Sequence, residues 1–530
     1  MPEGMTPLLA DIYPEPAMKG FRETLARYGA LLDCLAFASV NGFIYQQPQP
    51  FDMPGPDGPP SPEWIGAEIG RRAEVAAAAL ENRIWRDNID RWDAELKPAA
   101  IARHRELGDV VVADLDDAEL GAHIAECMDQ LEAMVYQHHR FNVSALLPVG
   151  DLALQGSALL GRPPTDFFSL LNGHSPASGV HCPEILPAVD ALRADPDAIE
   201  LLRSNADAGE TLTTLRARVP AVDEFVRSVG FRLLDGFDVS SPTALEHPGT
   251  ILGRLSTALT ADPEEARASA DAIAEEYRSQ LDDEDRERFD ALLAEARYVY
   301  RLRDERGLYS DISATGILRL ALLDLGRRMV AAGDLDDATH LFELGAAELR
   351  QALTGGGWPS AADFASRAEA RRALVTAGAP RLLGPPPPPP PPLEELPPPL
   401  ARVMGGVGFA IEGILGQLEE SAGDETSVGG IGANPGVYEG RVHLVRTLDD
   451  LWSIEEGDVL VTRATGEAFN AMIHLVGAIV TDHGSFASHA AIIARECGFP
   501  AVVGCVDATA RIEHGQRVRV DGGEGLVTLL

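Results

Sequence analysis

The 530-residue chain is too long for one hydrophobic core, so we expect two to four domains. Its net charge of −38 argues against nucleic acid or an anionic membrane as a partner, because both attract basic surfaces. The five cysteines are scattered without a CxxC pair, which indicates reduced thiols and predicts no protein-bound metal. We expect neither a membrane span nor a secretory signal, and therefore a cytoplasmic location.

Residues 1–380 have the composition of a mainly helical domain. The stretch 263–307 is rich in Ala, Leu, Glu and Arg, and its apolar residues recur three and four positions apart. The stretch 316–353 predicts two further helices, separated by a Gly-Asp turn. Strand signals are sparse here. We therefore assign 1–380 to one α-helical domain.

A proline-rich segment follows this domain and predicts a hinge. Residues 384–400 read GPPPPPPPPLEELPPPL, and the run Pro385–Pro392 predicts a polyproline II helix. At about 3.1 Å per residue such a run is a semi-rigid spacer. We assign 381–428 to a hinge or linker with a short helix over 401–420, and expect the segment behind it to move.

Residues 429–530 predict a small α/β domain. Short β-branched runs such as DVLVT, VGAIVTD and QRVRVDG are bounded by Gly, Asp and Pro, and a helix is expected between two of them at 488–497. The chain is therefore expected to be multidomain, with a mainly α-helical body and a small C-terminal α/β domain.

The stretch TDHGSFASHAAIIARECGFPAVVG (481–504) places a histidine where a helix begins. Gly484 allows the turn after a buried strand, and Ser488 is a good N-cap. His489 then stands at the positive end of the helix dipole, which favours an anion and lowers the pKa of the imidazole. A neutral imidazole there could carry a phosphoryl group. From spacing alone, a plain polar surface histidine remains the alternative.

This stretch resembles the signature of the phosphohistidine swivelling domain of the PEP-utilising enzyme family, which includes PEP synthase, pyruvate phosphate dikinase and rifampin phosphotransferase. Shared features are the Thr-Asp pair, a glycine, Ser before His, and the run Ala-Arg-Glu-x-Gly-x-Pro-Ala-Val. Ser485 replaces a second glycine, and Phe499 replaces the usual Ile. The resemblance implies that His489 is the phosphocarrier, with phosphate or loop support from Thr481, Asp482, Gly484, Ser485, Ser488 and Arg495.

The helical body weakly resembles the substrate-binding domain of the rifampin phosphotransferase type, in YPEPAMKGFRETL and FFSLLNGHSPAS. We find no glycine-rich phosphate loop followed by Lys. The resemblance therefore implies that a separate ATP-grasp subunit holds ATP and Mg²⁺ and charges His489, as in phenylphosphate synthase, and that this chain binds no cofactor itself. The phosphoryl group would pass from His489 to a hydroxyl of a small organic substrate in the helical body.

Several residues of the helical body are candidates for binding the substrate, and each also has a purely structural interpretation. Arg297 and Arg301 lie four apart and could brace a phosphoryl group, or form an exposed face paired with acidic neighbours. His138 and His139 could supply a general base, although adjacent residues are expected to face different ways. His174 could line a pocket on a loop.

A different function class is also open at this point. The chain could be a phosphohistidine carrier in a protein phosphorelay, with the helical body as a docking module, or a relative that has lost activity. An enclosed apolar pocket within 1–380 would favour the phosphotransferase.

Overall fold

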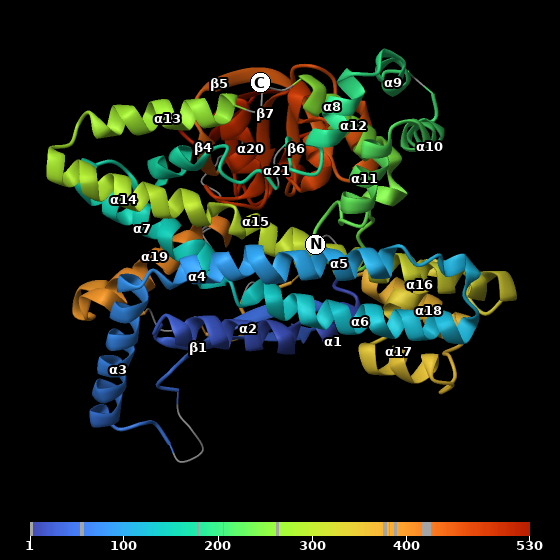
Figure 1. The fold of residues 1–530 in the computed structure, drawn as a ribbon, viewed down its shortest axis with the longest axis horizontal. Coiled ribbons are helices and arrows are strands. Elements are labelled where there is room, and N and C mark those ends of the chain that lie inside the picture. The colour runs from blue at the N-terminus through green and yellow to red at the C-terminus, as the bar shows by residue number, and fades with distance from the viewer. Residues whose placement is uncertain are drawn as a thin grey trace. The chain divides into compact units, whose positions relative to one another are not determined.

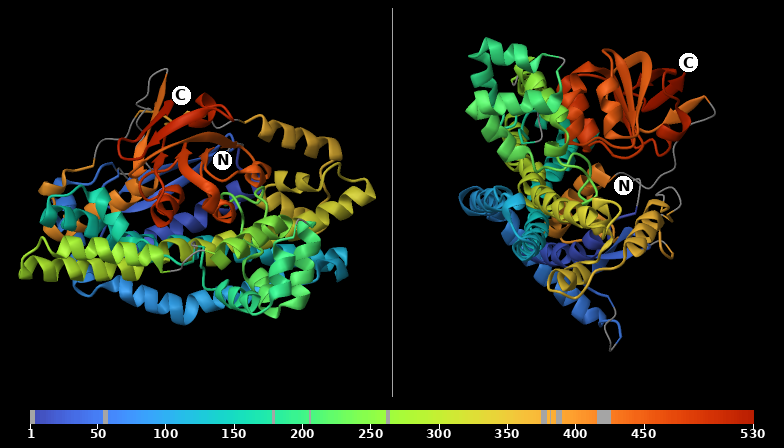
Figure 2. Two further views of the ribbon diagram at one scale, coloured as in Figure 1. Left: turned by 90° about the horizontal axis from the view of Figure 1, so that it is seen from above. Right: turned by 90° about the vertical axis from the view of Figure 1, so that its right-hand side faces the viewer.

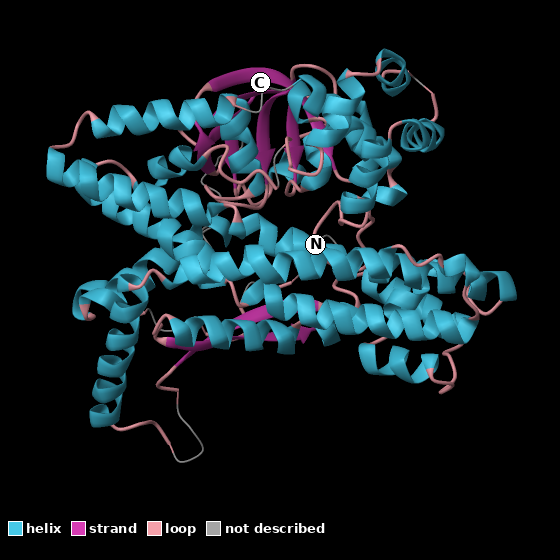
Figure 3. Cartoon of the chain, viewed as in Figure 1, coloured by secondary structure: helices cyan, strands magenta, loops and turns pink. Residues whose placement is uncertain are grey.

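The computed structural model describes residues 4–53, 58–177, 180–204, 206–260, 264–374, 379–380, 382–385, 390–415 and 426–530. Helices dominate outside the C-terminal segment, which forms an α/β sheet domain, as expected (Figures 1 and 3). The chain divides into two compact units, each built from three segments. Unit 1 comprises Met1–Ser144, Phe231–Thr243 and Glu305–Met404, and unit 2 comprises Ala145–Gly230, Ala244–Asp304 and Gly405–Leu530.

These units are discontinuous in sequence, whereas the division into 1–380, 381–428 and 429–530 is continuous and stays a prediction. The α/β segment falls in one unit with the helices of 145–230 and 244–304. The helix expected over 401–420 is α19 (Pro398–Leu415). The predicted polyproline II run falls partly outside the described residues.

Unit 1 packs a long helix, α6 (Asp117–His139), against α2 (Pro14–Arg27) and α16 (Ser313–Ala332). Two π-helical turns, η1 (Trp92–Leu96) and η5 (Leu308–Ile312), interrupt this regular pattern. The remaining α-helices that fall within this unit are α1 (Pro7–Ile12), α3 (Pro62–Glu81), α4 (Ile84–Arg91), α5 (Lys97–Gly108), α17 (Ala346–Leu353) and α18 (Ala361–Arg372).

Unit 1 also contains one β-hairpin beside the helices of the predicted, mainly α-helical body. Strands β1 (Leu32–Val40) and β2 (Phe43–Pro50) pair antiparallel. The turn between them is Asn41-Gly42, and both residues have positive φ, 49° and 79°. Asn-Gly is the preferred sequence for this tight turn, because it tolerates positive φ at both positions.

The helical part of unit 2 surrounds α14 (Asp283–Tyr300), which leads into α15 (Leu302–Gly307) near the unit boundary. The other helices of this part are α7 (Asn142–Leu160), α8 (Leu186–Arg193), α9 (Pro196–Leu202), α10 (Ala208–Arg218), α11 (Pro220–Val229), α12 (Pro248–Thr260) and α13 (Glu265–Arg278).

One helical stretch, Asp117–Leu160, differs from the expectation that no segment could span a membrane. It is long and apolar enough by length and composition, and 67% of its apolar window is buried inside the protein. Buried core helices of soluble proteins pass the same test, so this is weak evidence for a span.

The α/β part of unit 2 gathers the C-terminal strands into one sheet (Figure 2). The strand order is β3-β10-β9-β5-β6-β7-β8-β4, and the central run β5-β6-β7-β8 is parallel. The strands are β3 (Ser427–Gly429), β4 (Ile431–Asn434), β5 (Val437–Val445), β6 (Asp458–Thr462), β7 (Val476–Thr481), β8 (Ala501–Val503), β9 (Arg517–Asp521) and β10 (Leu526–Leu529), with α20 (His489–Cys497) and α21 (Ala508–Arg511) between them.

Burial explains why these short runs form strands. The β-branched residues Val459, Val461, Val480, Val502 and Val518 are fully buried in one core. Because β6, β7 and β8 are parallel, their carboxyl ends meet at one edge of the sheet. The loops that follow these three strands therefore lie close together.

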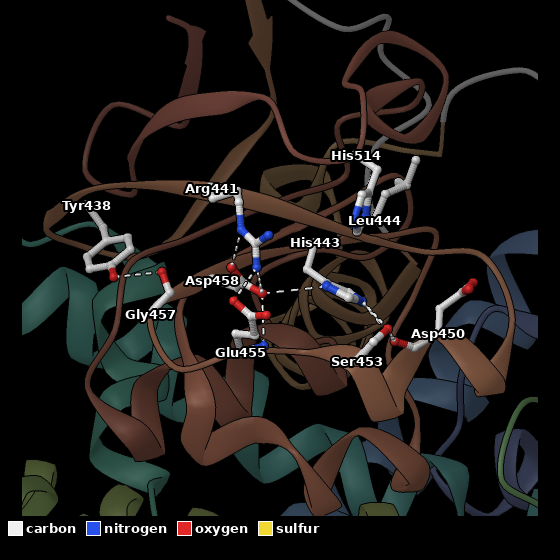
Figure 4. A network of polar contacts seen from close by, with 10 residues as sticks. All are labelled: Tyr438, Arg441, His443, Leu444, Asp450, Ser453, Glu455, Gly457, Asp458 and His514. Carbon is white, nitrogen blue, oxygen red and sulfur yellow. Dashed lines mark hydrogen bonds and ion pairs between the residues drawn. The ribbon is translucent and has the colours of Figure 1, made fainter.

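A polar network ties the opposite, amino-terminal edge of the sheet (Figure 4). Asp458, at the start of β6, accepts from Arg441 Nε at 3.2 Å and lies 3.5 Å from His443 Nδ1. Tyr438 donates its hydroxyl hydrogen to the Gly457 carbonyl at 2.8 Å. These contacts link β5 to the start of β6, so this network holds the sheet together.

Shortening a core side chain in β7 should loosen the sheet. Ile479 is fully buried, and we expect Ile479→Ala to lower the free energy of local opening by about 2–5 kcal/mol. Amide hydrogen exchange of β7 measures this opening directly. Val437→Ala, at a position 52% exposed, is the control and should change it by less than about 0.5 kcal/mol. Equal exchange in the two variants would contradict this account of the core.

Candidate phosphohistidine site

His489 is the first residue of α20, as the sequence predicts. Ser488 is the N-cap, and its hydroxyl accepts from the Ala491 backbone N–H at 3.5 Å. The buried Ile492 and Ile493 follow in the same helix, which packs on β4, β7 and β8. The sheet therefore fixes the position of the histidine.

Two glycines shape the loop before the helix. Gly484 has φ 119°, and a Cβ there would lie 2.8 Å from Ser488 Oγ. Gly504, after β8, has φ 68°, and a Cβ there would lie 2.7 Å from the Gly484 carbonyl oxygen. Both positions therefore favour glycine, because both have positive φ and a Cβ would be too close to Ser488 at the first position and to the Gly484 loop at the second.

Thr481 and Asp482 support the loop through contacts away from the histidine ring. Asp482 accepts from the Thr509 backbone N–H at 2.8 Å and from the Thr509 hydroxyl. Burial raises the pKa of the Asp482 carboxyl. Thr481 donates its hydroxyl hydrogen to the His483 carbonyl at 2.8 Å. The buried Ser485 hydroxyl has no hydrogen-bond partner within the described chain.

The two ring nitrogens of His489 have different surroundings. Nδ1 lies 2.8 Å from the Thr465 hydroxyl, in the loop after β6. Nε2 is shielded from solvent and has no hydrogen-bond partner among the described residues. When Thr465 accepts from Nδ1–H, Nε2 carries the lone pair and is the nucleophilic nitrogen. Thr465 was not among the residues predicted from the sequence, although a polar residue just after a parallel strand often belongs to a functional site.

The imidazole of His489 is neutral at physiological pH. Burial lowers its pKa to about 4, with Asp304 opposing this shift and Arg303 adding to it. The lowered pKa agrees in direction with the expectation from the helix dipole, but its largest cause is burial. A neutral ring at pH 7 keeps the lone pair of Nε2 available.

Two arginines of unit 2, Arg303 and Arg495, have N–H groups that are buried. Arg303 Nη1, and Nε and Nη2 of Arg495, are buried without hydrogen-bond partners among the described residues. Arg495 Nη1 donates to the Ala433 carbonyl at 3.1 Å. Buried N–H groups without partners are costly, and an anion placed near them would remove that cost.

A hydrogen bond joins α20 to the helical part of unit 2. Glu496 accepts from the Gly173 backbone N–H at 3.2 Å. Burial raises the pKa of the Glu496 carboxyl to about 7. Ser175 donates to the carboxylate of Asp304 close by. The turn at 173–175 is therefore one surface on which this helix rests.

Arg297 and His174 lie together in unit 2, and Arg301 directly follows α14, the helix that contains Arg297. Arg297 donates to the Leu170 carbonyl at 2.9 Å and to Asp271 at 2.6 Å. Burial lowers the pKa of His174 to about 4, and Arg297 adds to this shift. Within the described chain neither residue has a hydrogen bond to His489. Arg303, rather than Arg297, acts electrostatically on the phosphocarrier candidate.

His138 and His139 lie at the end of α6 in unit 1. Their rings stack, with centroids 4.6 Å apart and planes at 19°, although the two side chains bind partners on different elements. His138 Nδ1 lies 2.8 Å from Asp311 Oδ1. His139 Nε2 lies 2.7 Å from the Tyr13 hydroxyl.

Two segments of the chain match known protein families. Residues 454–525 match the family described as PEP-utilising enzyme, mobile domain, and this segment includes Thr465 and His489. Residues 184–304 match the rifampicin phosphotransferase fourth domain, and this segment includes Arg303. The two matched segments thus contain the histidine, its hydroxyl partner and the neighbouring arginine.

Similarity to individual proteins extends over more of the chain. Chondramide synthase cmdD of Chondromyces crocatus is 30% identical over 338 residues, which are 59% of this chain and 8% of that protein. The phosphotransferase YvkC of Bacillus subtilis is 27% identical over 321 residues, 58% of this chain and 36% of that protein. Rifampicin phosphotransferase of a Streptomyces species is 28% identical over 366 residues, 66% and 39% respectively. The chain spans well under half the length of these relatives.

Removing the hydroxyl beside Nδ1 should slow phosphorylation of His489. In Thr465→Val the ring loses the contact that fixes its tautomer, and we expect about tenfold slower labelling by phosphoramidate, a small phosphoryl donor. Thr465→Ser keeps the hydroxyl and should restore the rate. Equal rates for the Val variant and the unmodified chain would show that Thr465 does not orient the ring.

Titration of His489 should reflect its burial. In the folded protein the ring NMR signals should change with a midpoint near pH 4, whereas in denaturant the midpoint should return to about 6.5. The unfolded chain then binds more protons between these values, so this residue lowers the free energy of unfolding as the pH falls from about 6.5 towards 4. A folded-state midpoint near 6.5 would contradict a buried, neutral ring.

Proposed function

From the match of residues 454–525 to the mobile domain of PEP-utilising enzymes, we propose that this chain is a phosphotransferase component in which His489 carries a phosphoryl group. The group comes from ATP and passes to a hydroxyl of a small organic molecule. Similarity to YvkC and to rifampicin phosphotransferase supports the reaction class. The proposed location is the cytoplasm, where ATP is present.

The observation that carries this proposal is the asymmetry of the His489 ring. Nδ1 is held by Thr465, while Nε2 is neutral, buried and without a partner among the described residues. Nε2 attacks the phosphorus of the donor, a new N–P bond forms, and the bond from phosphorus to the leaving oxygen breaks. Shielding from water then slows hydrolysis of the phosphohistidine.

Arg303 and Arg495 supply positive charge for the phosphoryl group. Their unpartnered N–H groups are buried beside the helix that begins at His489, and a phosphoryl group on Nε2 would add negative charge there. Hydrogen bonds to charged oxygens are about twice as strong as neutral ones. Positive charge and hydrogen-bond donors near the place where charge develops stabilise the transition state.

We assign the charging step to a separate ATP-grasp subunit that holds ATP and Mg²⁺. In the PEP-utilising enzymes that this sequence resembles, an ATP-grasp domain binds the nucleotide. The segments 184–304 and 454–525 match other domains of those enzymes. In this family the donor step yields AMP and inorganic phosphate, so the β-phosphate is the group that stays on the histidine.

Label transfer tests this function. The chain is incubated with ATP labelled at the β-phosphate, alone and with a candidate ATP-grasp subunit. We expect acid-labile label on the chain only with that subunit, and none in His489→Ala. Arg303→Gln should lower the labelling rate by about 10²–10³, because one donor to the developing charge is lost. Arg288→Gln, on an exposed face of α14, is the matched control and should label normally.

Other outcomes would lead to different conclusions. Label without the subunit would move the nucleotide site onto this chain and contradict the split arrangement. Label that passes to a protein but to no small molecule would replace the phosphotransferase with a phosphorelay carrier. Label on His489→Ala would rule out His489 as the carrier.

A further inference from the structure

The loop before His489 is held by α19, the helix that begins at the end of the proline-rich segment. The backbone N–H of Ala487 donates to the carbonyl of Gly413 in α19 at 2.7 Å. Both residues belong to unit 2. The sequence predicts 381–428 as a hinge or linker, so an element of the predicted linker contacts the loop of the candidate site.

Phe486, in the same loop, packs against two other aromatic rings. It is buried, with an exposed fraction of 8%. Its ring stacks on Phe409 of α19, with centroids 5.2 Å apart and planes at 29°. Phe168, in the helical turn η3 (Pro164–Leu171), packs edge-on to it with centroids 5.0 Å apart. The ring of Phe486 therefore contacts both α19 and the helical part of unit 2.

Gly413 is the residue of α19 on which the Phe486 ring lies. A Cβ at position 413 would clash with Cε2 of Phe486 and would lie 2.9 Å from Cζ and 3.1 Å from Cδ2. Carbon atoms in van der Waals contact are about 3.5–4.0 Å apart, so any side chain here would displace the ring. Because Phe486 belongs to the loop before His489, displacing its ring would also displace that loop.

The helix α19 is itself fixed by close packing on α7 (Figure 1). A Cβ at Gly150 of α7 would clash with the carbonyl oxygen of Gly406 in α19. A Cβ at Gly406 would lie 3.0 Å from Cδ1 of Leu147 in α7. The two backbones are therefore in direct contact within unit 2, and interiors packed this closely transmit strain. Strain introduced at position 413 is then relieved in the loop rather than by movement of α19.

Each residue from 486 to 488 has a partner that fixes the loop. Phe486 has the two rings, Ala487 has the hydrogen bond to α19, and Ser488 is the N-cap of α20. The next residue is His489, whose Nδ1 lies 2.8 Å from the Thr465 hydroxyl. The placement of the imidazole therefore depends on the placement of this loop.

We propose that α19 is part of the phosphohistidine site, with Gly413 as the seat of Phe486 and Phe486 as a positioning residue for His489. This inference rests on the function proposed above. It gives the predicted linker a role in the chemistry beyond that of a spacer, because His489 is held in its reactive position only while α19 contacts the loop.

Chemical labelling of His489 tests this inference without a donor subunit. The full chain is incubated with labelled phosphoramidate. Nε2 of His489 attacks the phosphorus, an N–P bond forms, the P–N bond of the donor breaks, and ammonia leaves. Gly413→Ala should slow this labelling by about 10–100-fold, because a displacement of about 1 Å near a reacting group can cost about 10² in rate.

A glycine in the same helix provides the matched control. A Cβ at Gly408 of α19 would meet no atom within 4 Å. Gly408→Ala therefore adds the same methyl group to the same helix without a clash, and it should label at the rate of the unmodified chain. Thermal melting of both variants compares their stability.

A second substitution distinguishes positioning from a general loss of stability. Leucine lacks the ring atoms Cε2 and Cζ, so the double variant Gly413→Ala with Phe486→Leu has no clash at those atoms. Phe486→Leu alone should slow labelling by about threefold to tenfold, since leucine fills part of the space. The double variant should label as fast as Phe486→Leu alone and faster than Gly413→Ala alone.

The titration of His489 gives a spectroscopic readout of the same displacement. In the unmodified chain burial lowers the pKa of the imidazole to about 4. A displaced ring is less buried, so in Gly413→Ala the midpoint of the ring NMR signals should rise towards about 6.5. In Gly408→Ala it should stay near 4.

The outcomes separate this inference from the function on which it rests. Failure of the unmodified chain to label would overturn the proposed function and the inference with it. Normal labelling of the unmodified chain, with an equal rate in Gly413→Ala, would overturn the inference alone. Slow labelling of Gly413→Ala with an unchanged His489 midpoint and no recovery in the double variant would also overturn it. If Gly413→Ala does not fold, Phe486→Leu decides, and a rate equal to that of the unmodified chain would contradict the role of Phe486.

Discussion

Burial of an uncharged imidazole is the constraint on which the site depends. A histidine can attack phosphorus only from a neutral ring nitrogen, and water would both protonate the ring and hydrolyse the product. Burial lowers the pKa of His489 to about 4, and the Thr465 contact engages Nδ1. The same burial leaves Nε2 without a partner among the described residues.

The parallel sheet makes this arrangement possible. Thr465 follows β6, the glycine turn follows β7, and Gly504 follows β8. Their strands end at one edge, so residues from three loops meet around one helix terminus. The core valines hold the strands in register, and α20 carries the histidine on the same framework.

Local signals in the sequence predicted local structure well. The Ser488 cap, the turn at Gly484, and the helix carrying His489 depend on neighbouring residues, and each could be derived from the segment alone. The α/β character of 429–530 likewise follows from short β-branched runs bounded by turn residues. The Asn41-Gly42 turn is an equally local signal for a hairpin, but it lies between stretches with helical patterns and was not predicted.

Contacts between distant segments could not be predicted in this way. Thr465 lies 24 positions from His489, and Asp311 lies 173 positions from His138. No periodicity links such pairs, since the packing of separate elements brings them together. For the same reason the sequence analysis named Arg297 and Arg301 but not Arg303, which lies in the same charge-rich stretch and acts on His489 in the folded chain.

The contact between Glu496 and the Gly173 turn makes the packing of α20 on that turn depend on pH. While Glu496 contacts that turn, burial raises the pKa of its carboxyl to about 7. In water a glutamate has a pKa near about 4.3. A departure of α20 from the turn at neutral pH would therefore release a fraction of a proton to solvent, and its return would take that proton up again. By linkage, mild acidification favours the state in which α20 contacts the turn, so the position of α20 and the pH of the solution depend on each other.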